Sequence, residues 1–142
     1  MHSLHIARLT LSNFRNHAAL DLQLDARPVC LFGPNGAGKT NILEALTMLA
    51  PGRGLRGASL TDVARAGDEM RAQPWAISAR VANDGDETVL GAGAERTPEG
   101  GVKRLARRDG APATAAELAE VQTQCDLAGI PRCSGAQRLE LG

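Results

Sequence analysis

The hydrophobic and polar positions at the start of the chain alternate as they do in β-strands. Residues 4–11 carry apolar side chains on both sides of such a strand, and residues 18–25 alternate strictly, with a leucine at every second position from Leu20. A period of two is typical of a half-buried strand, so the pattern predicts an antiparallel pair joined by a turn over residues 13–17. The two apolar sides of the first segment are Ala7, Leu9 and Leu11, and Leu4 and Ile6.

A short apolar run over residues 28–32 follows, and it is typical of a strand covered on both faces in a parallel sheet. Cys30 lies inside this run, so we expect it to be buried and to behave as a small apolar residue. Glycines then interrupt the pattern, and residues 40–50 show the spacing of an amphipathic helix that ends at Pro51. The expected apolar stripe of this helix is Ile42, Leu43, Leu46 and Leu49.

Beyond residue 50 the pattern weakens. A loop is expected over residues 52–59 and a short helix over 60–65. Residues 114–121 resemble a helix opened by a capping box, with Thr114 as the cap and Glu117 three positions later. Three further strands are expected, over residues 75–82, 88–92 and 102–107.

The break between the apolar run and the first helix fits the phosphate-loop pattern G-x-x-x-x-G-K-[ST]. Its glycines let main-chain amides approach a phosphate, and the helix start adds positive potential at the same place. Lys39 is expected to reach the β- and γ-phosphates, and the Thr40 hydroxyl to bind Mg²⁺. A glycine-rich turn that binds nothing is the alternative. The predicted site for ATP and Mg²⁺ consists of Gly33, Pro34, Asn35, Gly36, Ala37, Gly38, Lys39 and Thr40.

Composition narrows the class of protein. The 142 residues suffice for one domain or a fragment of one, and the 16 basic and 16 acidic residues cancel, which excludes a strongly basic nucleic-acid module. No apolar stretch is long enough to span a membrane, and the first residues do not resemble a signal peptide. Three widely separated cysteines predict free thiols and a cytoplasmic protein.

Several segments closely resemble the start of the bacterial RecF family of DNA replication and repair proteins. They are residues 9–16, 20–25, 32–46, 51–57 and, more weakly, 103–111. The resemblance implies an α/β fold, namely the N-terminal half of an ABC- or SMC-type P-loop ATPase head with a β-rich lobe. It covers residues 1–121. Residues 122–142 diverge, which suggests a reading-frame shift, a truncation or a curtailed gene model.

The family resemblance also implies a function in DNA repair, DNA replication and the SOS response. It implies ATP binding, ATP-dependent homodimerisation, binding of DNA at junctions of single strand and duplex, and cooperation with recombination mediator proteins in loading the recombination machinery at gaps. The alternative is a truncated nucleotide-binding remnant without activity.

Three groups of basic residues allow two interpretations each. Arg15 is a phosphate-proximal residue by resemblance or a solvated turn residue. Arg53 and Arg56 meet phosphates of nucleotide or DNA, or lie in an exposed loop. The third group is a basic run that contacts DNA phosphates, or whose charges protect a solvated edge strand against aggregation. It consists of Lys103, Arg104, Arg107 and Arg108.

Whether the chain is an enzyme is left open by two missing motifs. An ABC-type ATPase needs four apolar strand residues ending in Asp, which hold Mg²⁺ through water, and a Ser-x-Gly-Gln signature; neither occurs in the sequence. Residues 133–137 resemble a degraded signature, but only five residues follow Gln137, so we interpret the match as chance. A GTPase would need Asn-Lys-x-Asp and a small-molecule kinase an acceptor-binding lid, and neither is recognisable.

Overall fold

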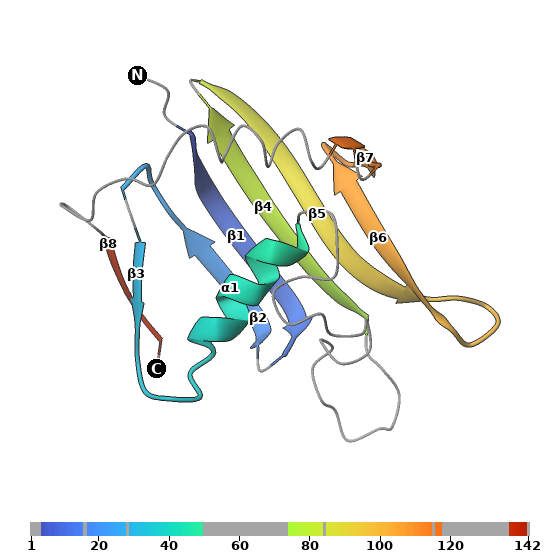
Figure 1. The fold of residues 1–142 in the computed structure, drawn as a ribbon, viewed down its shortest axis with the longest axis horizontal. Coiled ribbons are helices and arrows are strands. Elements are labelled where there is room, and N and C mark those ends of the chain that lie inside the picture. The colour runs from blue at the N-terminus through green and yellow to red at the C-terminus, as the bar shows by residue number, and fades with distance from the viewer. Residues whose placement is uncertain are drawn as a thin grey trace.

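A six-stranded antiparallel sheet forms the body of the molecule, in the strand order β2-β1-β4-β5-β6-β7 (Figure 1). The computed structural model describes residues 4–15, 17–27, 29–49, 74–83, 85–114, 116–117 and 137–141. The sheet strands are β1 (Leu4–Phe14), β2 (His17–Gln23), β4 (Trp75–Asn83), β5 (Asp86–Arg96), β6 (Val102–Arg108) and β7 (Ala111–Pro112). A separate parallel pair consists of β3 (Val29–Phe32) and β8 (Gln137–Glu140), and the helix α1 spans Lys39–Met48.

The antiparallel pairing of the first two strands is confirmed, with Leu9 opposite Leu22 and Leu11 opposite Leu20. A register shift between Ile6 and Arg8 interrupts the pairing of β1 with β4. A bulge of this kind changes which side of the strand faces the core. Ile6 therefore packs against the same core as Leu9, although strict alternation would place the two side chains on opposite faces.

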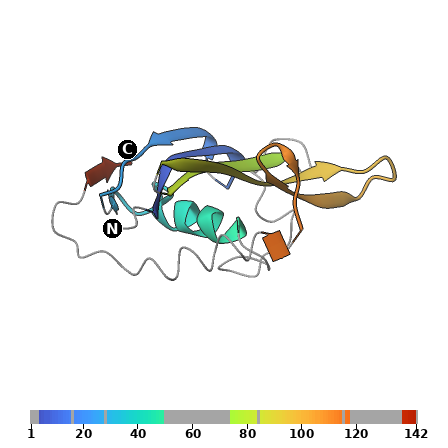
Figure 2. The ribbon, with the colours of Figure 1, turned by 90° about the horizontal axis from the view of Figure 1, so that it is seen from above.

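The core lies between α1 and one face of the sheet (Figure 2). Phe14 and Trp75 meet edge to face, with their ring centroids 5.5 Å apart. An edge-to-face pair adds stabilisation beyond the burial of its area. The buried apolar residues are Leu9, Leu11, Phe14, Ile42, Ala45, Met48, Leu49, Trp75, Ile77, Ala79, Val81, Leu90, Ala92, Ala94 and Leu141.

The helix is confirmed, but its expected apolar stripe is partly wrong. Leu43 is 51% exposed, whereas Glu44 is buried. Ile42 and Leu49 are buried as expected. The stripe prediction failed because it counted only apolar positions, and Glu44 enters the interior as one half of an ion pair.

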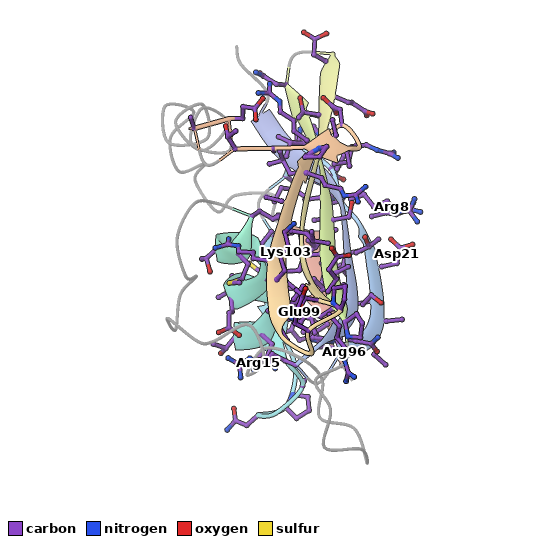
Figure 3. All side chains as sticks on the ribbon, turned by 90° about the vertical axis from the view of Figure 1, so that its right-hand side faces the viewer. Arg8, Arg15, Asp21, Arg96, Glu99 and Lys103 are labelled. Carbon is purple, nitrogen blue, oxygen red and sulfur yellow. The ribbon has the colours of Figure 1, made fainter. Side chains whose placement is uncertain are left out.

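The face of the sheet opposite α1 carries charged side chains. Arg8 and Asp21 project from it, away from the helix (Figure 3), and the Arg8 guanidinium donates to both carboxylate oxygens at 2.9 and 2.6 Å. This hydrogen bonding lowers the pKa of Asp21. Both side chains are solvent-exposed, so the pair is screened and we assign it little stabilising effect.

The parallel environment expected for the strand before the phosphate loop is confirmed, but its burial is not. β3 pairs in parallel with β8, with Leu31 opposite Leu139, while Val29 and Cys30 are exposed. The prediction that Cys30 is buried is therefore wrong. Within the described residues β3 has one partner strand and lies outside the six-stranded sheet, so its first residues lack cover. Strand β8 itself was not predicted.

The weaker strand predictions are confirmed as β4, β5 and β6, and β5 is longer than expected. The capping box is also present. The Thr114 amide donates to the Glu117 carboxylate at 2.6 Å, and the Glu117 amide donates to the Thr114 hydroxyl at 3.3 Å. The Thr114 amide and the Thr114 hydroxyl, which both donate to the Glu117 carboxylate, lower the pKa of Glu117. The expected loop over 52–59, the helix over 60–65 and residues 118–136 lie outside the described residues. None of the described helices is long and apolar enough to cross a membrane.

Replacing Ile77 by Ala should lower the free energy of unfolding by about 2–5 kcal/mol, because the side chain is 1% exposed and its removal leaves a cavity. Val89→Ala is the matched control. Val89 is 38% exposed on the neighbouring strand, and its truncation should change stability by less than about 0.5 kcal/mol. Urea unfolding measures both, and equal losses would contradict the assigned core.

Candidate phosphate-binding site

The predicted phosphate loop connects the end of β3 at Phe32 to the start of α1 at Lys39. The Ala37 amide donates to the Pro34 carbonyl at 3.1 Å, which closes a tight turn inside the loop. Gly38 caps the helix in the left-handed conformation, with φ 97° and ψ 18°, and no side chain caps the helix start. This conformation is accessible to glycine without a steric penalty. The first amides of α1 have no partners within the helix, so their positive potential is directed toward the loop.

The start of the loop is held by the segment that follows β8. The Leu141 amide donates to the Phe32 carbonyl at 2.9 Å, and Leu141 is buried. A Cβ atom at Gly33 would collide with the Leu141 carbonyl oxygen. Glycine at this position therefore permits the close approach of two main chains as well as the turn itself.

Two polar side chains of the predicted site lie at the helix start. The Lys39 ammonium donates to the Gly33 carbonyl at 2.7 Å, so the side chain folds back across the loop. An ammonium group has three donors, so Lys39 can keep this bond and still bind phosphate oxygens. Thr40 is exposed in the first turn of α1, where its hydroxyl is accessible to a metal ion.

A histidine outside the motif also contacts the loop. His17, the first residue of β2, is buried, and its Nε2 lies 3.2 Å from the Gly38 carbonyl oxygen. The same oxygen accepts the first helical hydrogen bond, from the Ile42 amide at 3.1 Å. The carbonyl of the capping residue is therefore held by two partners. Nothing in the phosphate-loop pattern indicates a contact from residue 17.

Arg15 lies in the β1–β2 turn and binds Glu44 of α1 through two hydrogen bonds, Nε to Oε1 at 2.8 Å and Nη2 to Oε2 at 3.0 Å. The Glu44 side chain is 1% exposed and that of Arg15 is 21% exposed. The interpretation of Arg15 as a solvated turn residue is therefore not supported. Its backbone φ of 51° is rare for a residue with a side chain, and the paired carboxylate stabilises it there.

The basic run on β6 divides between the two faces of the sheet. Arg104 lies on the helix side and donates to the Met48 carbonyl at 2.9 Å, where a cation stabilises the negative end of α1. Lys103 and Arg107 are exposed. One member of the run therefore has a structural role, whereas two can still meet a partner.

The described residues thus bring together all eight positions of the predicted site in one loop and helix start. Main-chain amides and an ammonium group are the donors that a polyphosphate requires, so the residues present fit a nucleoside triphosphate. No group of three or more His, Cys, Asp or Glu side chains lies together in the described part of the chain. A metal ion at this site would be held by the Thr40 hydroxyl together with phosphate oxygens. Arg53, Arg56 and most of the signature-like segment fall outside the described residues, and Gln137 begins a strand.

Sequence comparison identifies proteins that this chain resembles. Residues 8–68 match the model of an AAA domain. The chain is 46% identical over 121 residues to the DNA replication and repair protein RecF of Rhizobium meliloti, covering 84% of this chain and 31% of that protein. It is 49% identical over 107 residues to the protein of the same name from Agrobacterium fabrum, covering 75% of this chain and 28% of the relative. The resemblance to the RecF family is confirmed.

Solved structures agree on the fold. The recombination mediator protein RecF with ATP, from the RecFOR pathway, superimposes with a TM-score of 0.66 at 24% identity, over 83% of this chain and 31% of the other. The SMC head domain from Thermotoga maritima gives a TM-score of 0.61 at 18% identity, over 84% of this chain and 41% of the other. The predicted fold class, an α/β P-loop NTPase of the RecF and SMC head type, is thereby confirmed. The chain spans about 31% of the length of the RecF relative from R. meliloti.

The Arg15–Glu44 pair allows a direct test of its energetic role. Arg15→Met should lower the free energy of unfolding by about 3–5 kcal/mol, because it removes the guanidinium that pairs with the buried Glu44 carboxylate. The double variant Arg15→Met with Glu44→Leu should recover most of this loss, since two apolar side chains replace both charges.

Chemical denaturation of the two variants and of Arg8→Met measures the difference. Arg8 forms a similar two-bond pair with Asp21, but both side chains are exposed, so its replacement should have little effect. Equal effects of Arg15→Met and Arg8→Met would contradict the assigned role of the buried pair.

Proposed function

We propose that this chain binds ATP with Mg²⁺ through residues 33–40 and acts in DNA repair and replication as a RecF-type protein. The observation that carries the proposal is the geometry of the loop between β3 and α1. A left-handed glycine opens the helix, and the Lys39 ammonium lies across the loop mouth at the Gly33 carbonyl. The similarity to RecF proteins, one of them solved with ATP, supports ATP as the nucleotide.

Each group has a separate part in binding. The amides of the loop and the first helical turn donate to phosphate oxygens, and Lys39 neutralises charge between the β- and γ-phosphates. Thr40 holds Mg²⁺ through its hydroxyl, and the bound ion supplies further charge neutralisation. The remaining loop residues, Pro34 to Ala37, shape the turn that directs the amides inward.

The proposed setting follows from the RecF-type resemblance. We infer that the protein acts in the cytoplasm, binds DNA where a single strand meets duplex, dimerises when ATP is bound, and works with recombination mediator proteins to load the recombination machinery at gaps. The exposed Lys103 and Arg107 support contact with DNA phosphates, which would make DNA affinity depend on salt. A remnant that binds nucleotide without these partners is the alternative, and DNA binding separates the two.

Lys39→Ala should weaken MgATP binding by about 10- to 100-fold, the loss expected for one charge-assisted hydrogen bond. Lys103→Ala is the matched control. The chain has only two lysines, and Lys103 lies exposed on β6, away from the loop. Isothermal titration calorimetry of the full chain measures both. Absence of MgATP binding by the folded wild-type chain at millimolar concentration would refute the proposal.

ATP turnover is a separate expectation. The 142-residue chain should hydrolyse ATP negligibly, because its sequence has neither the apolar run ending in Asp nor the signature of ABC-type enzymes. Phosphate release under multiple-turnover conditions measures this. Sustained phosphate release by the wild-type chain that is lost in Lys39→Ala would contradict this expectation. The proposal that the chain binds ATP would still stand.

A further inference from the structure

We propose that His17 is a positioning residue for the phosphate site. Through its hydrogen bond to the Gly38 carbonyl it fixes the peptide that joins the loop to α1, and it thereby orients the first amides of the helix toward phosphate. The inference rests on the proposed function, since it assigns these amides to a polyphosphate. His17 itself is outside the binding motif and is not expected to touch the ligand.

The chemistry of the contact defines the state of the imidazole ring. A carbonyl oxygen only accepts hydrogen bonds, so the His17 Nε2, 3.2 Å from the Gly38 oxygen, carries a hydrogen. His17 is 9% exposed as a whole residue, so water does not readily replace the contact. Loss of the imidazole would remove one of the two hydrogen-bond partners of the Gly38 carbonyl. Leaving a buried polar group short of partners costs free energy.

The consequence for the loop follows from peptide geometry. In a planar trans peptide the carbonyl and the next amide point in opposite directions. The Gly38 carbonyl is held on the protein side by His17 and by the Ile42 amide, so the Lys39 amide points away from both. Gly38 has φ 97°, a conformation that glycine leaves without a steric penalty, so an external partner is needed to restrict this peptide.

The β1–β2 turn provides a firm base for His17. Phe14 pairs with His17 across the turn, and Phe14 is fully buried against Trp75. Arg15 in the same turn binds Glu44 near the middle of α1. The turn therefore holds the helix at two points, and the His17 contact is the one at the phosphate end.

Three substitutions separate the hydrogen bond from the volume of the ring. His17→Gln places an amide nitrogen at nearly the distance of Nε2 from the main chain, and it should retain the contact. His17→Asn ends one bond short, and His17→Leu has no donor. MgATP affinity of the full chain should fall about fivefold to tenfold for the Asn and Leu variants, the effect of one hydrogen bond, and should be largely restored by Gln. His5→Leu, in the half-buried part of β1 that pairs with β4, is the matched control and should leave affinity unchanged.

Rescue by Gln with similar thermal unfolding midpoints would support the proposal. Wild-type affinity in His17→Leu, or equal weakening in all three variants, would overturn it. Amide hydrogen exchange of Ile42, whose amide donates to the Gly38 carbonyl, gives a second readout without nucleotide. Exchange there should accelerate in the Asn and Leu variants, and unchanged exchange would overturn the positioning role even if the chain bound no ATP. Failure of the proposed function would be seen as absent MgATP binding by the wild type. It is thus distinguishable from failure of the positioning role of His17.

If the variants do not fold, a measurement on the wild-type chain tests the hydrogen bond from His17 to the Gly38 carbonyl. Nitrogen NMR of the imidazole ring reports which nitrogen is protonated. A protonated Nε2 whose hydrogen exchanges slowly with water is the expected result. A neutral ring protonated only at Nδ1 would place a lone pair against the Gly38 oxygen and would overturn the proposal.

Discussion

The ion pair between Arg15 and Glu44 is the constraint on which the arrangement of sheet and helix depends. It joins the β1–β2 turn to Glu44 of α1, the helix that follows the phosphate loop, and the Glu44 side chain is 1% exposed. A buried charge is tolerated only with a well-placed partner, so the sheet and α1 cannot separate or slide without exposing an unpaired group. The apolar core alone is non-directional and would not fix this register. The pair thus sets where the loop lies relative to the turn.

Much of this arrangement was predictable from local pattern. The alternation over residues 18–25 predicted β2, the glycine-rich break predicted the junction of strand and helix, and Thr114 with Glu117 predicted a capping box that the structure contains. These features depend on residues close together in the chain, and their periodicity or spacing encodes them directly.

Features that depend on distant residues were not predictable in the same way. The burial of Glu44 requires Arg15, which is 29 positions earlier, and the bulge between Ile6 and Arg8 appears only when β4 pairs with β1. Strand β8 gains its partner from β3, more than 100 residues away, and Cys30 is exposed because β3 lies outside the main sheet. His17 contacts the loop across the fold, and no motif requires it. The residues of the loop were evident from the sequence, but the side chains that hold the loop were not.

The hydrogen bond from Arg104 to the last turn of α1 has a mechanical consequence. His17 secures one end of the helix from β2 at one side of the sheet, and Arg104 secures the other end from β6 near the opposite side. The helix therefore acts as a strut between two distant strands. A displacement of the helix that carries Met48 with it would break the Arg104 bond or draw on β6. Lys103 and Arg107 extend from that same strand into solvent, so β6 carries both exposed cations and a contact to the helix that begins at the loop.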